Sequence, residues 1–126
     1  MQIKLCSVFV EDQARALAFY TEKLGFEVVN NIDLGEFRWL TVGESGDANV
    51  ELLLEPNAHP AALAFQQAIY ADGIPAAVLN TEDIDQEYAN LIDKGVNFKD
   101  KPTNAGGAWL AVFDDTCGNW IQLVQV

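Results

Sequence analysis

The chain has 126 residues, half of them hydrophobic, and its 7 Lys and Arg against 19 Asp and Glu give a net charge of −12. This length predicts a single domain, residues 1–126, and the apolar half can form a buried core, which excludes a disordered chain. The strong negative charge excludes a nucleic-acid partner and disfavours binding to anionic membranes. No stretch approaches the roughly 18 apolar residues of a membrane span, and the first residues do not resemble a signal peptide.

The two cysteines, Cys6 and Cys117, are far apart in the sequence and form no CxxC pair. Without a secretory signal, this usage favours reduced thiols in a cytoplasmic protein. The strand phase of Cys6 predicts that it packs beneath a helix as a small hydrophobic residue. Cys117 falls in a turn that could expose its thiol, although no neighbouring cation would lower the thiol pKa.

The first half of the chain reads as a strand, a helix and three further strands. Asp12 is a typical N-cap, and Gly25 is placed where a helix commonly ends. Between them, apolar residues recur at helical spacing. The four strands are predicted over residues 3–10, 26–32, 37–42 and 50–55.

The second half repeats this order after a connecting helix. Pro60 suits the first turn of that helix, predicted to continue through residues 61–71. Asp83, with Gln86 three residues later, begins the next helix, and Gly95 ends it. The strands of this half are predicted over residues 75–80, 96–98, 108–114 and 120–126.

The chain therefore reads as two βαβββ modules, residues 1–56 and 73–126, joined by a helical connection over residues 57–72. The sequence Val50-Glu51-Leu52-Leu53 matches Ile121-Gln122-Leu123-Val124 at an offset of 71 residues. One module alone would leave a sheet with a bare face. We therefore predict an α+β fold in which the two sheets curl around a common cavity with the helices outside.

Three segments resemble the vicinal oxygen chelate superfamily, which includes glyoxalase I, extradiol dioxygenases, fosfomycin-modifying enzymes and bleomycin-resistance proteins. The segments are 8–26 (with Val8-Phe9-Val10-Glu11-Asp12, Ala18-Phe19-Tyr20 and Leu24-Gly25-Phe26), Val50-Glu51-Leu52, and the stretch from Phe113 to Leu123. The resemblance implies the glyoxalase/bleomycin-resistance fold, a mixed sheet that encloses a cavity, and assembly as a homodimer. Because this fold hosts lyases, transferases, dioxygenases and binding proteins, it does not fix the function.

The resemblance also implies four metal-ligand positions, which map here to Leu5, Glu51, Ile74 and Gln122. Metal-dependent members place His or Gln, Glu, His and Glu at these positions. Leu and Ile side chains cannot coordinate a cation, and catalytic divalent metals generally need about three protein ligands. We therefore expect no cofactor, with a divalent metal as the disfavoured alternative.

Glu51 is the leading candidate for a catalytic or binding residue. Strand alternation places it on the face opposite Val50 and Leu52, which the resemblance makes the cavity side. There it would serve as a general base or a cation anchor. The alternatives are a carboxylate on a solvated sheet face or a structural carboxylate hydrogen-bonded to Gln122 or Trp120. Gln122 should share the cavity and could orient a ligand, but the pattern slightly favours a structural hydrogen bond.

The other candidate ligand-binding residues line the same predicted strands. Ser7 and Phe9 share the phase of Leu5, and Arg38 could pair with Glu51, bind an anion or lie on the surface. The indoles of Trp39, Trp109 and Trp120 suit cavity walls, although aromatic residues more often fill cores. The only histidine, His59, lies in the connection and is read as a surface residue, which argues against a Ser–His nucleophile pair with Ser7.

These observations favour a homodimer that binds a small molecule in a cavity lacking the complete metal site, as bleomycin-resistance proteins do. The negative charge and the indoles favour a cationic or aromatic ligand. Two alternatives remain open. One is a metal-dependent lyase or dioxygenase similar to glyoxalase I, and the other is a domain whose only role is assembly.

Overall fold

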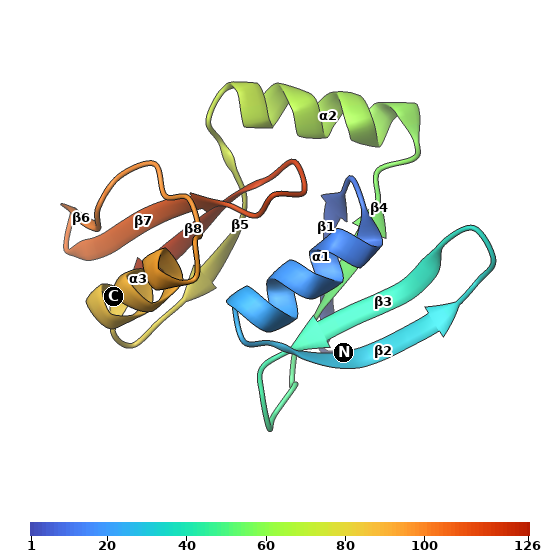
Figure 1. Cartoon of the computed structure of the whole chain (residues 1–126), viewed down its shortest axis with the longest axis horizontal. Coiled ribbons are helices and arrows are strands. Elements are labelled where there is room, and N and C mark those ends of the chain that lie inside the picture. The colour runs from blue at the N-terminus through green and yellow to red at the C-terminus, as the bar shows by residue number, and fades with distance from the viewer.

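The structure is a computed structural model that describes all 126 residues, with eight strands and three α-helices (Figure 1). The strands are β1 (Leu5–Val10), β2 (Glu27–Asp33), β3 (Arg38–Gly43), β4 (Glu51–Pro56), β5 (Pro75–Asn80), β6 (Thr103–Ala105), β7 (Ala108–Asp114) and β8 (Trp120–Gln125). The helices are α1 (Gln13–Ala18), which continues into a π-helical segment η1 (Phe19–Lys23), α2 (Pro60–Ala71) and α3 (Ile84–Asp93). No helix is long and apolar enough to cross a membrane.

The strands form two four-stranded mixed sheets of the same topology. Sheet A has the order β1-β4-β3-β2, and sheet B has the order β5-β8-β7-β6. In each sheet the first strand of the module pairs parallel with the last one, and the other neighbours are antiparallel. The predicted α+β fold of two βαβββ modules is therefore confirmed. α2 crosses from one sheet to the other along one side of the molecule, at the top of Figure 1.

Local signals set the helix boundaries as predicted. The Asp12 and Asp83 carboxylates accept hydrogen bonds from Arg15 N at 2.9 Å and Gln86 N at 3.1 Å, so both are N-caps. Gly25 and Gly95 follow the helices with φ of 81° and 84°, a left-handed conformation that L side chains rarely adopt.

The predicted strand over residues 96–98 is wrong. Only Phe98 forms an isolated bridge, to Phe113, and the edge strand of sheet B is β6 instead. The Gly106-Gly107 pair explains the difference, because φ of 66° and 92° at these two residues allows a tight hairpin between Ala105 and Ala108.

One hydrophobic core joins the modules. Its 16 buried residues come from both modules, and the rings of Phe19 on η1 and Phe113 on β7 lie 6.2 Å apart. No strand of sheet A pairs with a strand of sheet B, so the sheets are not closed. The predicted enclosure of a cavity is therefore not reached within one chain, because the two modules meet through the core at their helix-bearing sides.

A buried carboxylate ties the modules together beside this core. Asp115 is fully buried and accepts hydrogen bonds from the Tyr20 hydroxyl at 2.7 Å and the Asn119 side chain at 2.8 Å, and also from the backbone N–H of Cys117 and Asn119. Burial raises the pKa of Asp115, while these hydrogen bonds oppose that rise. The contact links η1 of the first module to the β7–β8 turn of the second.

A pair of lysines shows that the modules are related by a local two-fold axis. Lys23 Nζ donates to Lys94 O at 2.7 Å, and Lys94 Nζ donates to Lys23 O at 3.3 Å, across a separation of 71 residues. Each ammonium thus caps the C-terminal end of the other module's helix. The separation equals the offset between the matching final strands of the repeat.

Candidate functional site

Each sheet has one face toward the core and a second face that we call its open face. Alternation along the strands assigns side chains to the open face wherever their neighbours join the core. The open face of sheet A carries Leu5, Ser7, Phe9, Asn30, Ile32, Trp39, Thr41, Glu51, Leu53 and Glu55. The open face of sheet B carries Val78, Asn80, Leu110, Val112, Asp114, Trp120, Gln122 and Val124.

Large apolar side chains on these faces are exposed to solvent. The exposed fractions are 37% for Leu5, 51% for Ile32, 39% for Trp39 and 55% for Val78. Ile32 and Trp39 are register partners, so their exposed side chains lie side by side on sheet A, and adjoining exposed apolar side chains are a common feature of binding surfaces.

Glu51 lies on the open face of sheet A within a polar cluster of three side chains. Its Oε1 accepts hydrogen bonds from Thr41 Oγ1 at 2.7 Å and from Asn30 Nδ2 at 2.9 Å. The predicted partners of a structural carboxylate, Gln122 and Trp120, are wrong, because both lie on the other sheet. The sequence argument missed Thr41 and Asn30, although alternation with Trp39 would have placed Thr41 on this face.

Gln122 is the corresponding polar residue of sheet B. It lies opposite Val78 on β5 and Val112 on β7, and its half-buried side chain makes no hydrogen bond within the chain. Its amide therefore has free donors and an acceptor on an otherwise apolar part of the face.

The residues around Glu51 and Gln122 do not fit the metal site that the family resemblance implies. Leu5 is the register partner of Glu51. Ile74 lies just before β5, with its backbone N–H donating to Ile69 O, and the register partner of Gln122 is Val78. Leu5, Ile74 and Val78 are all aliphatic and cannot coordinate a metal. Nowhere in the chain do three His, Cys, Asp or Glu side chains gather as a ligand set.

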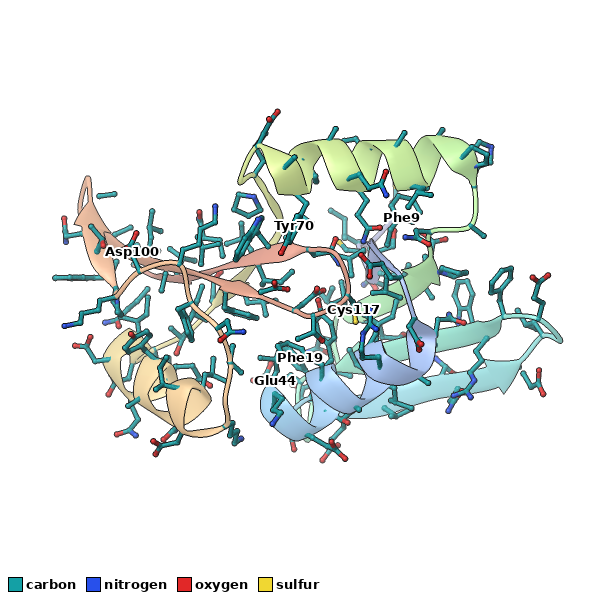
Figure 2. All side chains as sticks on the ribbon, turned by 45° about the horizontal axis from the view of Figure 1, so that its top comes forward. Phe9, Phe19, Glu44, Tyr70, Asp100 and Cys117 are labelled. Atoms are coloured by element: carbon teal, nitrogen blue, oxygen red, sulfur yellow. The ribbon has the colours of Figure 1, made fainter.

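Trp120 is packed by protein groups on the open face of sheet B. Its ring stacks on Tyr70 of α2 with centroids 4.9 Å apart, and Lys99 Nζ lies 4.5 Å from the ring centroid. The Tyr70 hydroxyl donates to Asp114 at 2.8 Å, and this hydrogen bond raises the pKa of Tyr70 to about 12. Figure 2 shows Tyr70 reaching from α2 toward sheet B. These contacts hold the C-terminal end of α2 against the sheet.

The remaining candidates are divided between the faces. Ser7, Phe9 and Trp39 share the open face of sheet A with Glu51. Trp109 has the phase of Ala111 and Phe113, which places it on the core side at the sheet edge. Arg38 is likewise in phase with core residues of β3 and forms no ion pair with Glu51, since the single ion pair of the chain joins Arg15 and Glu11.

Both predictions about the cysteines and the reading of His59 need revision. Cys6 is exposed rather than packed beneath a helix, because it lies at the solvent end of the edge strand β1. Cys117 is buried at the junction of the modules (Figure 2), and burial raises its pKa to about 11. His59 is exposed as predicted but also caps α2, accepting a hydrogen bond from Ala61 N at 3.0 Å.

A groove of about 450 Å³ runs between the edge strands β1 and β5. Its lining is mostly apolar and includes Cys6, Ser7 and Glu51 from the first module and Ala76 to Leu79 from the second. The groove thus brings Ser7 and Glu51 to one border, whereas Gln122, Arg38 and the three tryptophans do not line it.

Comparison with known proteins agrees with this architecture. A family model described as the Glyoxalase/Bleomycin resistance protein/Dioxygenase superfamily matches residues 2–123. The protein YurT of Bacillus subtilis (strain 168) is 51% identical over 126 residues, which span 99% of each chain.

Two crystal structures are similar over nearly the whole chain. UcmS2 is 37% identical, with a TM-score of 0.85 and coverage of 98% of this chain and 97% of UcmS2. TnmS3, an antibiotic binding protein from Streptomyces sp. CB03234, is 31% identical, with a TM-score of 0.78 and coverage of 99% and 95%.

Proposed function

Because the chain belongs to the Glyoxalase/Bleomycin resistance protein/Dioxygenase superfamily, we propose that it binds a small organic molecule on its open sheet faces without a resident metal. One observation carries this proposal. Glu51, a hydrogen-bonded carboxylate, lies on an apolar sheet face beside Leu5, whose side chain has no atom that could coordinate a metal. A face of this composition can hold an apolar body and orient it through a few polar groups. The antibiotic-binding activity of the similar protein TnmS3 supports this class of function.

We further propose that the functional form is a homodimer in which a second copy covers the open faces. Each face carries exposed apolar side chains, and β1 and β5 are unpaired sheet edges. Covering apolar faces and edges of this kind is favourable in water. Light scattering at micromolar concentration should give twice the mass of one chain, and a monomer mass would contradict the dimer.

The binding function is tested by nuclear magnetic resonance titration with a library of small aromatic molecules. We expect at least one neutral or charged member to shift the signals of Leu5, Trp39 or Val78 on the open faces. Trp39→Ala should weaken this binding, because an indole provides much of the apolar contact area. Phe65→Ala, which shortens an exposed side chain on α2, should leave the binding unchanged. If no member shifts the open-face signals, the proposed function is wrong.

A further inference from the structure

The cluster around Glu51 fixes the position of one carboxylate oxygen. Thr41 is fully buried, and its Oγ1 accepts hydrogen bonds from the Asn30 backbone N–H at 3.1 Å and from Asn30 Nδ2 at 3.2 Å. A hydroxyl has one proton to donate. Since Asn30 supplies donors to Thr41, the Thr41 proton is directed to Glu51 Oε1, 2.7 Å away.

A β-bulge makes this arrangement possible. The register between β2 and β3 shifts between Val28 and Asn30, so one extra residue is inserted in β2. The shift leaves the Asn30 backbone N–H directed at the Thr41 hydroxyl rather than at a ladder carbonyl. A bulge disrupts the ladder locally in this way, so that backbone groups beside it can find other partners.

The second oxygen of Glu51 is left for a ligand. Both protein donors reach Oε1, while Oε2 receives no hydrogen bond from the chain, and no cation lies within ion-pair distance of Glu51. An ionised carboxylate accepts about four hydrogen bonds. Sheet B has no equivalent, because the polar residue at the matching position is the neutral Gln122, flanked by Val78 and Val112.

We propose that Asn30 and Thr41 are positioning residues that hold Glu51 as the acceptor for a protonated amine, so that the ligand class is an ammonium group carried on an apolar or aromatic body. The amine N–H would donate to Oε2, and the apolar body would lie against the neighbouring exposed side chain of Leu5. A charge-assisted hydrogen bond of this kind is stronger than a neutral one. This assignment rests on the proposed binding function and adds the chemistry that the site selects.

Three probes of similar size separate the contributions to binding. Benzylammonium has a charge and N–H donors, benzyltrimethylammonium has the charge alone, and benzyl alcohol has neither charge nor N–H. Their dissociation constants are measured by titrating the full chain and following the backbone amide signals of Leu5 and Glu51, which every variant retains. We expect benzylammonium to bind about tenfold more tightly than benzyl alcohol, with the quaternary ion weaker than benzylammonium.

The variants test each member of the cluster. Glu51→Gln should abolish the preference for benzylammonium, whereas Glu22→Gln, which removes an exposed charge from η1, should keep it. Thr41→Val, which preserves shape but removes the donor, should reduce the preference by about fivefold, and Thr41→Ser should restore it. Asn30→Ala provides a second test if Thr41→Val does not fold, and it should also reduce the preference.

The outcomes distinguish this inference from the proposed function. Equal binding of the amine and the alcohol on the open face, or a preference that survives in Glu51→Gln, would overturn the inference while leaving the binding function in place. A preference that Thr41→Val and Asn30→Ala both leave unchanged would overturn the positioning role. If none of the three probes perturbs the open face, the inference fails, whereas failure of the whole aromatic library is needed to overturn the binding function.

Discussion

Individual residues of this protein owe their chemistry to neighbours that are distant in the sequence. Cys117 and Asp115 are buried at the junction of the modules, while Cys6 is exposed on an edge strand. The two thiols therefore differ in accessibility. The burial that raises the pKa of Cys117 also reduces its fraction of reactive thiolate.

This difference predicts the number of reactive thiols. In the native protein at neutral pH, a disulfide reagent such as Ellman's reagent should modify Cys6 and leave Cys117 unreacted. In denaturant both thiols should react. The Cys6→Ser variant should show no fast-reacting thiol in the native state, and rapid reaction of that variant would contradict the burial of Cys117.

The raised pKa of Tyr70 leads us to expect a change in stability at alkaline pH. Its pKa is raised from 10.0 to about 12 in the folded protein, mainly by the hydrogen bond to Asp114. The folded state thus holds the phenolic proton more tightly than the unfolded state, so the contribution of Tyr70 is fully present below pH 10 and is lost as the pH rises through about 12.

The measurement compares the unfolding free energy of the wild type and Tyr70→Phe across this range. The advantage of the wild type should stay constant up to about pH 10 and then shrink, because the Tyr70 hydroxyl is the one group titrating in this range that the variant lacks. An advantage that grows above pH 10 would show that the sign of the shift is opposite.

At the level of helices and strands, short-range hydrogen bonds set the boundaries and longer contacts set the packing. Asp12 and Asp83 begin equivalent helices, and Lys23 and Lys94 cap the opposite ends reciprocally. The repeat thus places the same type of residue at the same helix position in each module. The strand β6 shows the contrast, since it forms only because two glycines allow a hairpin onto β7.

The cap of α3 gives a prediction with a matched control. Asp83→Ala should lower the unfolding free energy by about 1 kcal/mol, because the Gln86 backbone N–H loses its acceptor. Asp93→Ala removes a carboxylate from the other end of the same helix, where a negative charge opposes the helix dipole. We expect that variant to be neutral or slightly stabilised in urea denaturation. Equal destabilisation by both substitutions would contradict the capping role.

The molecule as a whole is two open sheets joined by one core and bridged by α2 (Figure 1). This arrangement places Glu51 and Gln122 on the faces of different sheets rather than side by side in one sheet. The exposed apolar residues of both faces are the reason for expecting a second copy in solution. The aliphatic side chains at the other metal-ligand positions, which cannot coordinate a cation, are the reason for expecting no resident metal.

The metal expectation is tested by elemental analysis after dialysis against zinc, nickel, manganese and iron salts. We expect no stoichiometric divalent metal to be retained, because Leu5 and either Ile74 or Val78 provide no donor atoms. About one metal ion per chain, lost in Glu51→Gln, would contradict this prediction.

The repeat, the helix caps and seven of the eight strands could be predicted from the sequence alone. These features depend on hydropathy period and on hydrogen bonds between residues close in the chain, such as Asp83 with Gln86, so they are visible in a linear pattern. The same periodicity correctly assigned Glu51 to the side opposite the core. The family resemblance depends on three short segments of sequence instead, and the family model confirms it over residues 2–123.

The surroundings of Glu51 and the arrangement of the sheets depend on contacts between residues that are far apart in the sequence. The contact of Asn30 with Thr41 and Glu51 requires a bulge in β2, and no period of hydropathy reveals where a strand gains an extra residue. The burial of Cys117 and the absence of closure between the sheets follow from packing between modules. Such packing depends on how the surfaces of the two modules fit together in three dimensions, and this is the physical reason that the sequence pattern could not predict it.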